Sequence, residues 1–217
     1  MLKIIKIIIL IFTINCLFCN ELPNDIRWVV KSKEYKNLCK QIYRHASSQL
    51  EKNKWYGQNY NRPAIIMDLD ETVLDNSQYQ VEIFNKGETF NMKSWSKWVK
   101  RSNANLVPGS KAFIKKARAL GYQLIFISNR MHERLEYTKD NMKKLGIYNP
   151  NDIYLLRKNK KDTKDIRRGE VYKGTNRMSA YGPFNVVMYL GDAMGDFNRV
   201  KSHRENYIFP NPMYGKW

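Results

Sequence analysis

The chain has 217 residues, of which 43% are hydrophobic, and its 38 lysines and arginines against 20 aspartates and glutamates give a formal net charge of +18 at pH 7. It is long enough to bury the core of one α/β domain with insertions. It contains no internal repeat, low-complexity tract or Ser/Pro-rich linker, which excludes a repeat array and leaves one continuous folded unit. The positive charge attracts anions such as phosphorylated metabolites, nucleic acid or lipid headgroups, but alone it names no partner.

The first segment is expected to be a leader rather than part of the fold. An apolar run over residues 4–18, flanked and interrupted by Lys3 and Lys6, suits a signal peptide and is short for a membrane span. Cys16 and Cys19 close this run, at the place where a bacterial lipoprotein leader is cut and lipidated. Ordinary secretory cleavage and an uncleaved anchor are the alternatives.

We therefore expect a leader over residues 1–19 and one folded domain over 20–217. The protein is expected to be exported, either as an outer-membrane lipoprotein held in the membrane by a lipid anchor or as a periplasmic protein. The third cysteine, Cys39, lies in a predicted helix, and we expect no disulfide.

Predicted helices and apolar runs alternate along the rest of the chain. Helices are expected at about residues 23–54, 93–100, 110–120, 133–145 and 195–203. Strands are expected in the apolar runs that begin at residues 64, 123, 153 and 186, with 207–209 as a further candidate. This alternation implies right-handed crossovers, and so an α/β fold with a parallel sheet flanked by helices.

The run Ala-Ile-Ile-Met-Asp-Leu-Asp-Glu-Thr over residues 64–72 brings two carboxylates to an expected strand end. Open α/β sheets bind ligands at the carboxyl ends of their strands, and residues i and i+2 of an extended chain point the same way. Asp68 and Asp70 can therefore face one ligand, as an aspartate nucleophile and a neighbouring acid/base would. A solvated acidic loop is the alternative when the run is taken alone.

Two later apolar runs also end in polar residues. The first is followed by Ser128-Asn129-Arg130, and the second by Asp192 and then Asp196. A segment rich in lysine and arginine, around Lys164, lies between them.

This ordered set of motifs resembles that of the haloacid dehalogenase (HAD) phosphatases. The resemblance narrows to the class C acid phosphatases, HAD subfamily IIIB, which are bacterial surface lipoproteins of the 5′-nucleotidase type. The segments that carry it are residues 68–77, 95–98, 107–109, 128–130, 191–192 and 210–217. The resemblance implies a HAD-like Rossmannoid parallel sheet with a small helical cap, formed from about residues 20–60 and 78–106.

The resemblance also implies how the chemistry is divided. Asp68 would attack phosphorus to form an aspartyl phosphate, while Asp70 would protonate the leaving oxygen and then activate water. Ionised Asp68 and a phosphate dianion repel each other, so a hard cation, Mg²⁺, is expected between them. Its ligands would be the Asp68 carboxylate, the Asp70 backbone carbonyl and Asp192, with Asp196 nearby as support.

The remaining phosphate contacts follow from the second and third motifs. Ser128 would hydrogen-bond a phosphate oxygen, and Lys164 would place a point charge against the phosphate and the nucleophile. Lys160 and Lys161 compete with Lys164 for that role, because the connection from Lys164 to Gly191 is longer than the family's usual one and leaves the register of this segment open.

Three further residues are expected to bind the substrate outside the metal centre. Trp95 and Tyr214 match family positions at which aromatic side chains line the pocket and stack on a nucleobase or similar ring. Asn129 is grouped with them and also shapes the second motif, whereas Trp98 is assigned to the core.

We therefore expect an exported, Mg²⁺-dependent acid phosphatase, a phosphoric monoester hydrolase acting on small phosphomonoesters and on nucleoside 5′-monophosphates. The alternative is a non-catalytic surface lipoprotein that binds anionic ligands or nucleic acid. The sequence has no zinc-finger spacing and no recognition-helix pattern, so no specific nucleic-acid partner is expected. Analogy alone suggests a homodimer.

Overall fold

The computed structural model describes residues 21–56, 61–197 and 205–215, with only the backbone described at 53–56. The expected leader over 1–19, with Cys16 and Cys19, lies outside these residues. Within the described part of the chain, no helix is both long and apolar enough to cross a membrane.

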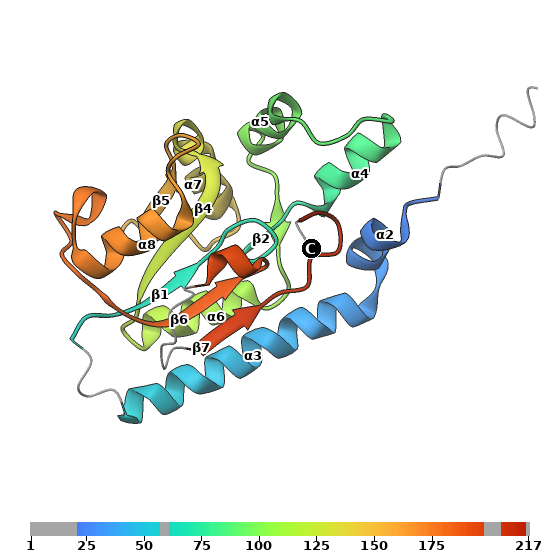
Figure 1. Ribbon diagram of the computed structural model, residues 1–217. Helices are drawn as coiled ribbons and strands as arrows, with labels where there is room; N and C mark the ends of the chain where they lie inside the picture. The colour runs from blue at the N-terminus through green and yellow to red at the C-terminus, as the bar shows by residue number, and fades with distance from the viewer. Residues whose placement is uncertain (1–20, 57–60, 198–204, 216–217) are drawn as a thin grey trace, which may run out of the picture.

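Five parallel strands form the central sheet, in the order β5-β4-β1-β6-β7 (Figure 1). Their bounds are β1 Pro63–Met67, β4 Gln123–Met131, β5 Ile153–Arg157, β6 Asn185–Gly191 and β7 Glu205–Ile208. The parallel sheet flanked by helices confirms the predicted α/β fold class. The strand that carries the first motif, β1, lies at the centre of the sheet.

Burial on both faces explains why the strands read as continuous apolar runs. Successive residues of β1 point to opposite faces, so Ile65 and Met67 belong to one buried cluster while Ala64 and Ile66 belong to another. The first cluster lies under helices α3 and α6, and the second lies under α8 (Figure 1). The sheet is thus a rigid platform whose carboxyl edge can hold a site.

The helices largely follow the sequence pattern, and their bounds are α2 Asn24–Lys31, α3 Lys33–Tyr56, α4 Ser77–Asn85, α5 Met92–Lys100, α6 Ser110–Ala119, α7 Leu135–Lys144 and α8 Lys164–Lys173. The single helix expected over 23–54 is wrong, because the chain is extended at Ser32 and two helices result. The Ser32 hydroxyl accepts a hydrogen bond from the Tyr35 amide at 3.0 Å, as a helix N-cap does.

Three other helical expectations also differ from the structure, and the first is α4, for which no helix was expected. Helix α8 was not expected, and it is held at its start by Thr163, whose hydroxyl accepts from the Ile166 amide at 3.3 Å. The helix expected over 195–203 appears as a short 3-10 turn, η3 Met194–Asp196, and its residues 198–203 lie outside the described part of the chain.

An insertion leaves the sheet after β1 and returns before α6. It is closed at its base by two short antiparallel strands, β2 Leu74–Asp75 and β3 Asn105–Leu106, and it contains α4 and α5. Helix α2 packs against α4, α5 packs against α7, and α3 runs along α6 and β7. Figure 1 shows α4 and α5 beyond the end of the sheet, above the loop that follows β1.

Gly174 is the residue that caps the carboxyl end of helix α8. Substitution of this glycine tests how that end of the helix is held. Gly174 has φ +63, and an added Cβ would lie 2.5 Å from the backbone nitrogen of Pro183. We expect Gly174→Ala to lower the free energy of unfolding in urea by about 1–3 kcal/mol. The matched variant Gly169→Ala lies inside the same helix with open space around its Cβ, and should stabilise by up to about 1 kcal/mol. Equal effects of the two substitutions would contradict this description of the α8 end.

Candidate active site

The motif residues meet at the carboxyl edge of the sheet. The Asp68 amide donates to the Leu190 carbonyl at 2.9 Å, which extends the pairing of β1 with β6 as far as Asp68. Asp192 directly follows β6, and Ser128 lies in β4, on the other side of β1. Residues from three neighbouring strands are therefore brought to one place, as the parallel sheet predicts.

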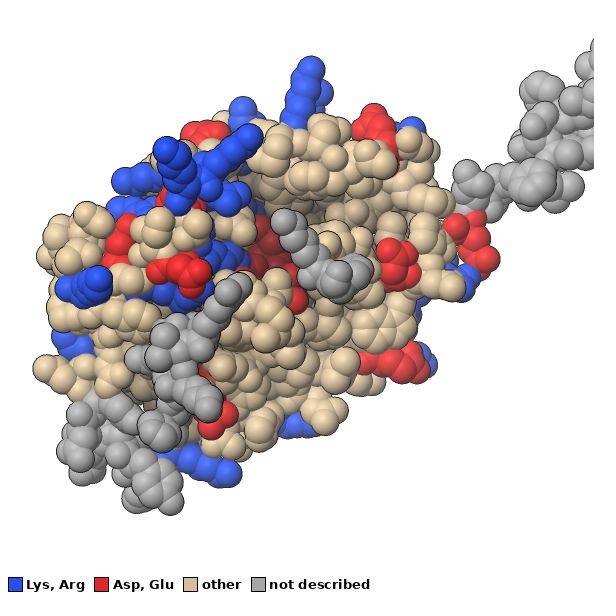
Figure 2. Space-filling view, in the orientation of Figure 1, with Lys and Arg blue, Asp and Glu red and all other residues tan. Residues whose placement is uncertain are grey.

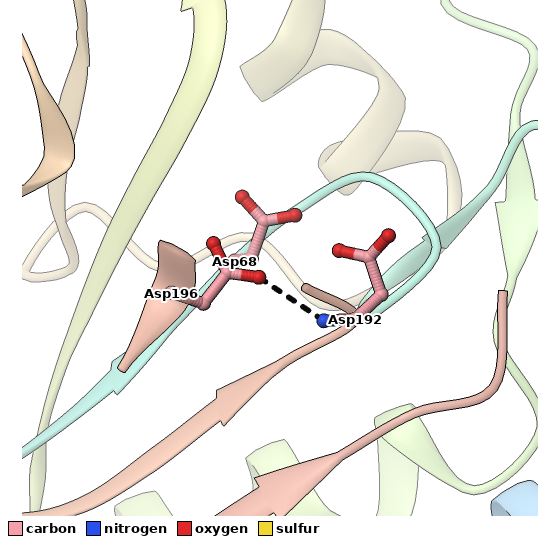
Figure 3. A group of neighbouring side chains, drawn as sticks. All are labelled: Asp68, Asp192 and Asp196. Carbon is pink, nitrogen blue, oxygen red and sulfur yellow. Dashed lines mark hydrogen bonds between the residues drawn. The ribbon is translucent and has the colours of Figure 1, made fainter. Parts of the chain in front are cut away.

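Three carboxylates form a cluster at this edge. Oxygen atoms of Asp68, Asp192 and Asp196 lie within 4.8 Å of one another (Figure 3). Asp68 and Asp196 are buried, and Asp192 is half-buried. So many acidic oxygens at short range repel one another strongly unless positive charge lies among them.

Lys164 places its positive charge among these carboxylates. Its ammonium donates to Asp68 Oδ1 at 2.6 Å and also to Asp196 Oδ1. The structure therefore brings Lys164 to Asp68, the expected nucleophile, whereas Lys160 and Lys161 are exposed. Within the described part of the chain, this one ammonium accompanies three carboxylates, so the cluster remains short of positive charge.

The pKa values of these side chains reflect the shortage of positive charge in the cluster. Burial raises the pKa of Asp68 well above its ordinary value; the Lys164 ammonium opposes this rise, and the carboxylates of Asp196 and Asp192 add to it. Burial and the neighbouring Asp196 raise the pKa of Asp192 to about 6. Burial alone would lower the pKa of Lys164, but the attraction of Asp68 and Asp196 outweighs it and raises that pKa.

Asp196 organises the loop that carries Asp192. Its Oδ2 accepts hydrogen bonds from the backbone amides of Asp192 at 3.1 Å and Ala193 at 3.0 Å. Gly191 lets this carboxylate approach, because a Cβ there would lie 2.3 Å from the Asp196 Cβ. The Asn211 side chain donates to Asp192 Oδ2 at 2.8 Å and so joins the end of the chain to the site.

This cluster fits a hard divalent cation. Buried carboxylate oxygens with unbalanced negative charge are the donors that Mg²⁺ prefers. Asp68 and Asp192 would be direct ligands. Both oxygens of Asp196 already accept hydrogen bonds, so it suits a supporting position.

The Asp70 side chain has its own set of partners. Asp70 Oδ1 accepts hydrogen bonds from Asn76 Nδ2 and Arg130 Nε, both at 2.9 Å. Asp70 Oδ2 faces the Ser128 hydroxyl at 3.3 Å. Ser128, expected to bind a phosphate oxygen, is therefore hydrogen-bonded to the expected acid/base.

The residues expected to bind the substrate are placed unevenly around this centre. Trp95 is half-buried on α5, and its ring centroid lies 5.8 Å from the Arg130 guanidinium carbon. Asn129 is exposed, and its side-chain oxygen accepts from Arg167 at 2.8 Å. Tyr214 is 38% exposed, in the terminal segment that Asn211 ties to Asp192.

Four site residues were missed or underrated by sequence reasoning: Asn76, Trp98, Arg167 and Asn211. Arg167 is fully buried and donates to the Ser128 and Leu155 carbonyls and to Asn129, so it ties α8 to the ends of β4 and β5. Asn76 and Asn211 lie inside the segments that carry the family resemblance, and this was the available signal. Trp98 is buried as expected, but its indole N–H also bonds to Asn76.

The charge around the site suits an anionic ligand. Figure 2 shows lysine and arginine side chains gathered over the part of the molecule where α7 and α8 lie, next to a hollow that contains acidic side chains. A basic rim of this kind attracts anions toward the hollow.

Comparisons with known proteins agree with this geometry. A family model described as HAD superfamily, subfamily IIIB (acid phosphatase) matches residues 12–217. The stem 28 kDa glycoprotein of Glycine max is 28% identical over 159 residues, which cover 70% of this chain and 60% of that protein. Acid phosphatase 1 of Solanum lycopersicum is 25% identical over 154 residues, which cover 70% of this chain and 59% of that protein. The chain thus spans about 60% of the length of these curated relatives.

Two solved structures show a similar fold over most of the chain. The class C acid phosphatase from Bacillus anthracis matches with a TM-score of 0.74 and 28% identity, covering 88% of this chain and 84% of that one. A second structure of that class C acid phosphatase, with tungstate bound, matches with a TM-score of 0.72, 29% identity and the same coverage.

The raised pKa of Asp192 makes cation binding depend on pH. Its folded-state pKa of about 6 exceeds its ordinary value of 3.8, so without a cation its contribution to stability is lost as pH rises through that window. A cation needs the ionised carboxylate, so Mg²⁺ should raise the thermal unfolding temperature more at about pH 7 than at about pH 5.

Scanning fluorimetry with Mg²⁺ or EDTA at both pH values measures this difference. Asp192→Asn should lose most of the Mg²⁺ shift, whereas Asp140→Asn, on the α7 surface and paired with Lys143, should keep it. A shift that is independent of pH and survives in Asp192→Asn would place the cation elsewhere.

Proposed function

Because the chain belongs to the class C acid phosphatases, subfamily IIIB of the HAD superfamily, we propose that it hydrolyses small phosphomonoesters through an aspartyl phosphate formed on Asp68. The observation that carries the proposal is the buried Asp68 carboxylate, which lies 2.6 Å from the Lys164 ammonium and beside Asp192 and Asp196. A phosphomonoesterase needs a nucleophile, an acid and concentrated positive charge at one point. Asp68, Asp70 and Lys164, together with a cation held by the acidic cluster, would meet that need.

The chain's own side chains divide the reaction into two steps. In the first, an Asp68 oxygen forms a bond to phosphorus while the bond to the leaving oxygen breaks, and Asp70 gives that oxygen its proton. In the second, Asp70 takes a proton from water, which attacks phosphorus and restores the Asp68 carboxylate. Lys164 holds Asp68 in place and offsets negative charge during both steps.

A divalent cation, which we propose is Mg²⁺, would be held by Asp68, Asp192 and the backbone carbonyl of Asp70, and when bound would offset the charge of the phosphate. The tungstate bound in the Bacillus anthracis structure supports an oxyanion site of this kind, because tungstate is tetrahedral like phosphate. The chain aligns with that protein over 88% of its length.

A non-catalytic surface protein that only binds anions is the less favoured alternative. Such a protein has no need for a buried aspartate paired to a buried lysine, because burying an ion pair costs solvation free energy. A basic surface alone would bind anions at lower cost. The paired Asp68 and Lys164 therefore support the enzyme. Export, inferred from the apolar leader, would give such an enzyme access to phosphate esters outside the cytoplasm.

Phosphate release tests the activity most simply. Asp68→Asn should reduce kcat/KM for p-nitrophenyl phosphate by about 10³-fold or more, because the amide cannot act as the nucleophile. EDTA should also abolish turnover, and added Mg²⁺ should restore it. Asp140→Asn serves as the matched control and should retain wild-type rates. An Asp68→Asn enzyme as active as the wild type would reject the mechanism, and a folded, Mg²⁺-supplied wild type without turnover would favour the binding protein.

The finer proposal is that nucleoside 5′-monophosphates are substrates and that Trp95 and Tyr214 contact the base. Stacking of an aromatic side chain on a base contributes about 1–3 kcal/mol, so Trp95→Ala and Tyr214→Ala should each lower kcat/KM for adenosine 5′-monophosphate about 5- to 100-fold. Glycerol phosphate, which has no ring, should be hydrolysed at nearly wild-type rates by both variants. Tyr181→Ala, an exposed tyrosine in the turn that precedes β6, is the control. Equal losses on both substrates would exclude base stacking.

A further inference from the structure

Asn76 is a fully buried side chain between β2 and α4 whose amide connects parts of the chain that are distant in sequence. Its Nδ2 donates to Asp70 Oδ1 at 2.9 Å and to the Leu74 carbonyl at 3.3 Å. Its Oδ1 accepts from Trp98 Nε1 at 2.8 Å and from Arg130 Nη2 at 3.2 Å. The side chain therefore makes contacts on both of its polar atoms.

These partners fix which way the amide faces. A carboxylate and a carbonyl can only accept from the nitrogen, while an indole and a guanidinium can only donate to the oxygen. If the amide were flipped, its N–H groups would face the N–H donors of Trp98 and Arg130, and its oxygen would face the acceptor oxygens of Asp70 and Leu74. In a buried place this costs several hydrogen bonds. The indole of Trp98 thus helps to hold the nitrogen of Asn76 toward Asp70.

The same contacts distinguish the two oxygens of Asp70. Asp70 Oδ1 accepts from Asn76 and from Arg130 Nε, and Arg130 Nη2 lies 2.8 Å from it. These N–H groups leave no room for a proton on Oδ1. Among the described residues, Asp70 Oδ2 has the Ser128 hydroxyl as its one hydrogen-bond partner, at 3.3 Å, and it is the oxygen that can carry a proton.

We propose that Asn76 is a positioning residue for the acid/base step, held in place by Trp98 of α5, and that Asp70 exchanges protons through Oδ2. This inference rests on the proposed function. In the first step the proton on Oδ2 moves to the leaving oxygen as that oxygen's bond to phosphorus breaks, which yields an alcohol and the Asp70 carboxylate. The N–H donors on Oδ1 then stabilise the carboxylate charge that has formed.

The position of Trp98 gives this arrangement a second consequence. Helix α5 carries both Trp95, the proposed base contact, and Trp98, the partner of Asn76. Arg130 links the same elements, because its guanidinium binds Asp70 and Asn76 and lies 5.8 Å from the Trp95 ring centroid. The helix that contacts the substrate ring is therefore joined to the acid/base by one intervening side chain.

The test uses two substrates that differ in how much they need an acid. The alkoxide that leaves glycerol phosphate is a poor leaving group and depends on protonation, whereas the anion that leaves 2,4-dinitrophenyl phosphate departs without it. General acid catalysis contributes about 10²–10⁴-fold, so Asn76→Ala should lower kcat/KM about 100-fold for glycerol phosphate and less than about 5-fold for dinitrophenyl phosphate.

Trp98→Phe is the milder variant, since it keeps an aromatic ring at this buried position while removing the N–H donor together with the second ring of the indole. Trp98→Phe should also lower kcat/KM more for glycerol phosphate than for dinitrophenyl phosphate. The loss on glycerol phosphate should be smaller than in Asn76→Ala, about 5- to 10-fold. If Asn76→Ala fails to fold, Trp98→Phe decides the question alone. The matched control is Tyr122→Phe, which removes a buried hydrogen bond to the Leu50 carbonyl at the opposite end of the sheet, and should change neither substrate.

Equal losses on the two substrates, or no loss in either variant, would overturn the positioning role. That result leaves the proposed function standing, provided that the wild type is active and Asp68→Asn is not. Inactivity of the wild type itself, or full activity of Asp68→Asn, would instead reject the proposed function.

Discussion

The imbalance of charge at the carboxyl edge of the sheet is the constraint on which the rest of the site depends. Asp68, Asp192 and Asp196 lie close together in a place largely shielded from water, with one ammonium, that of Lys164, among them. Isolated charges are expensive to bury, so such a cluster persists only where the fold holds it rigidly and where a ligand can complete it. Under the proposed function, a divalent cation and a phosphate ester together would provide that completion.

Contacts around helix α8 hold Lys164 in place beside these carboxylates. Lys164 begins α8, and α8 is held at both ends, by Thr163 at its start and by Gly174 at its finish. Behind the helix, Arg177 pairs with Asp162 at 3.0 Å and with Glu170 at 2.8 Å, while Arg167 reaches across to β4 and β5. These ion pairs and hydrogen bonds hold the long connection between Lys164 and β6 in place, and they position the lysine beside Asp68.

The strands and the motif residues could be predicted from the sequence because their signals are local. A parallel strand buried on both faces reads as a continuous apolar run, and β1, β4, β5 and β6 are such runs. Helix α8 could not be predicted this way. Its sequence is mostly charged and has Gly169 in its middle, so long-range contacts rather than its own pattern stabilise it. The break at Ser32 depends on a single side-chain cap, which a pattern of apolar residues does not reveal.

The same reasoning explains which parts of the candidate site were foreseen. Asp68, Asp70 and Asp192 follow the carboxyl ends of β1 and β6, and Ser128 follows the apolar run of β4, where position along the chain already indicates a role. Long-range hydrogen bonds, to residues 6 to 54 positions away, give Asn76, Arg167 and Trp98 their roles. A local sequence pattern does not reveal such contacts. The cap helix α5 was expected, but its connection to Asp70 through Asn76 became visible only in three dimensions.

The central claim is that Asp68 becomes phosphorylated during turnover. The most direct measurement is to quench the Mg²⁺-supplied enzyme with acid during turnover of a substrate carrying labelled phosphate, and to locate the label by peptide mapping. An acyl phosphate should survive acid, be released by hydroxylamine and map to the peptide that contains Asp68. Turnover with labelled phosphate on a different residue, or with none on the protein at any quench time, would contradict the account.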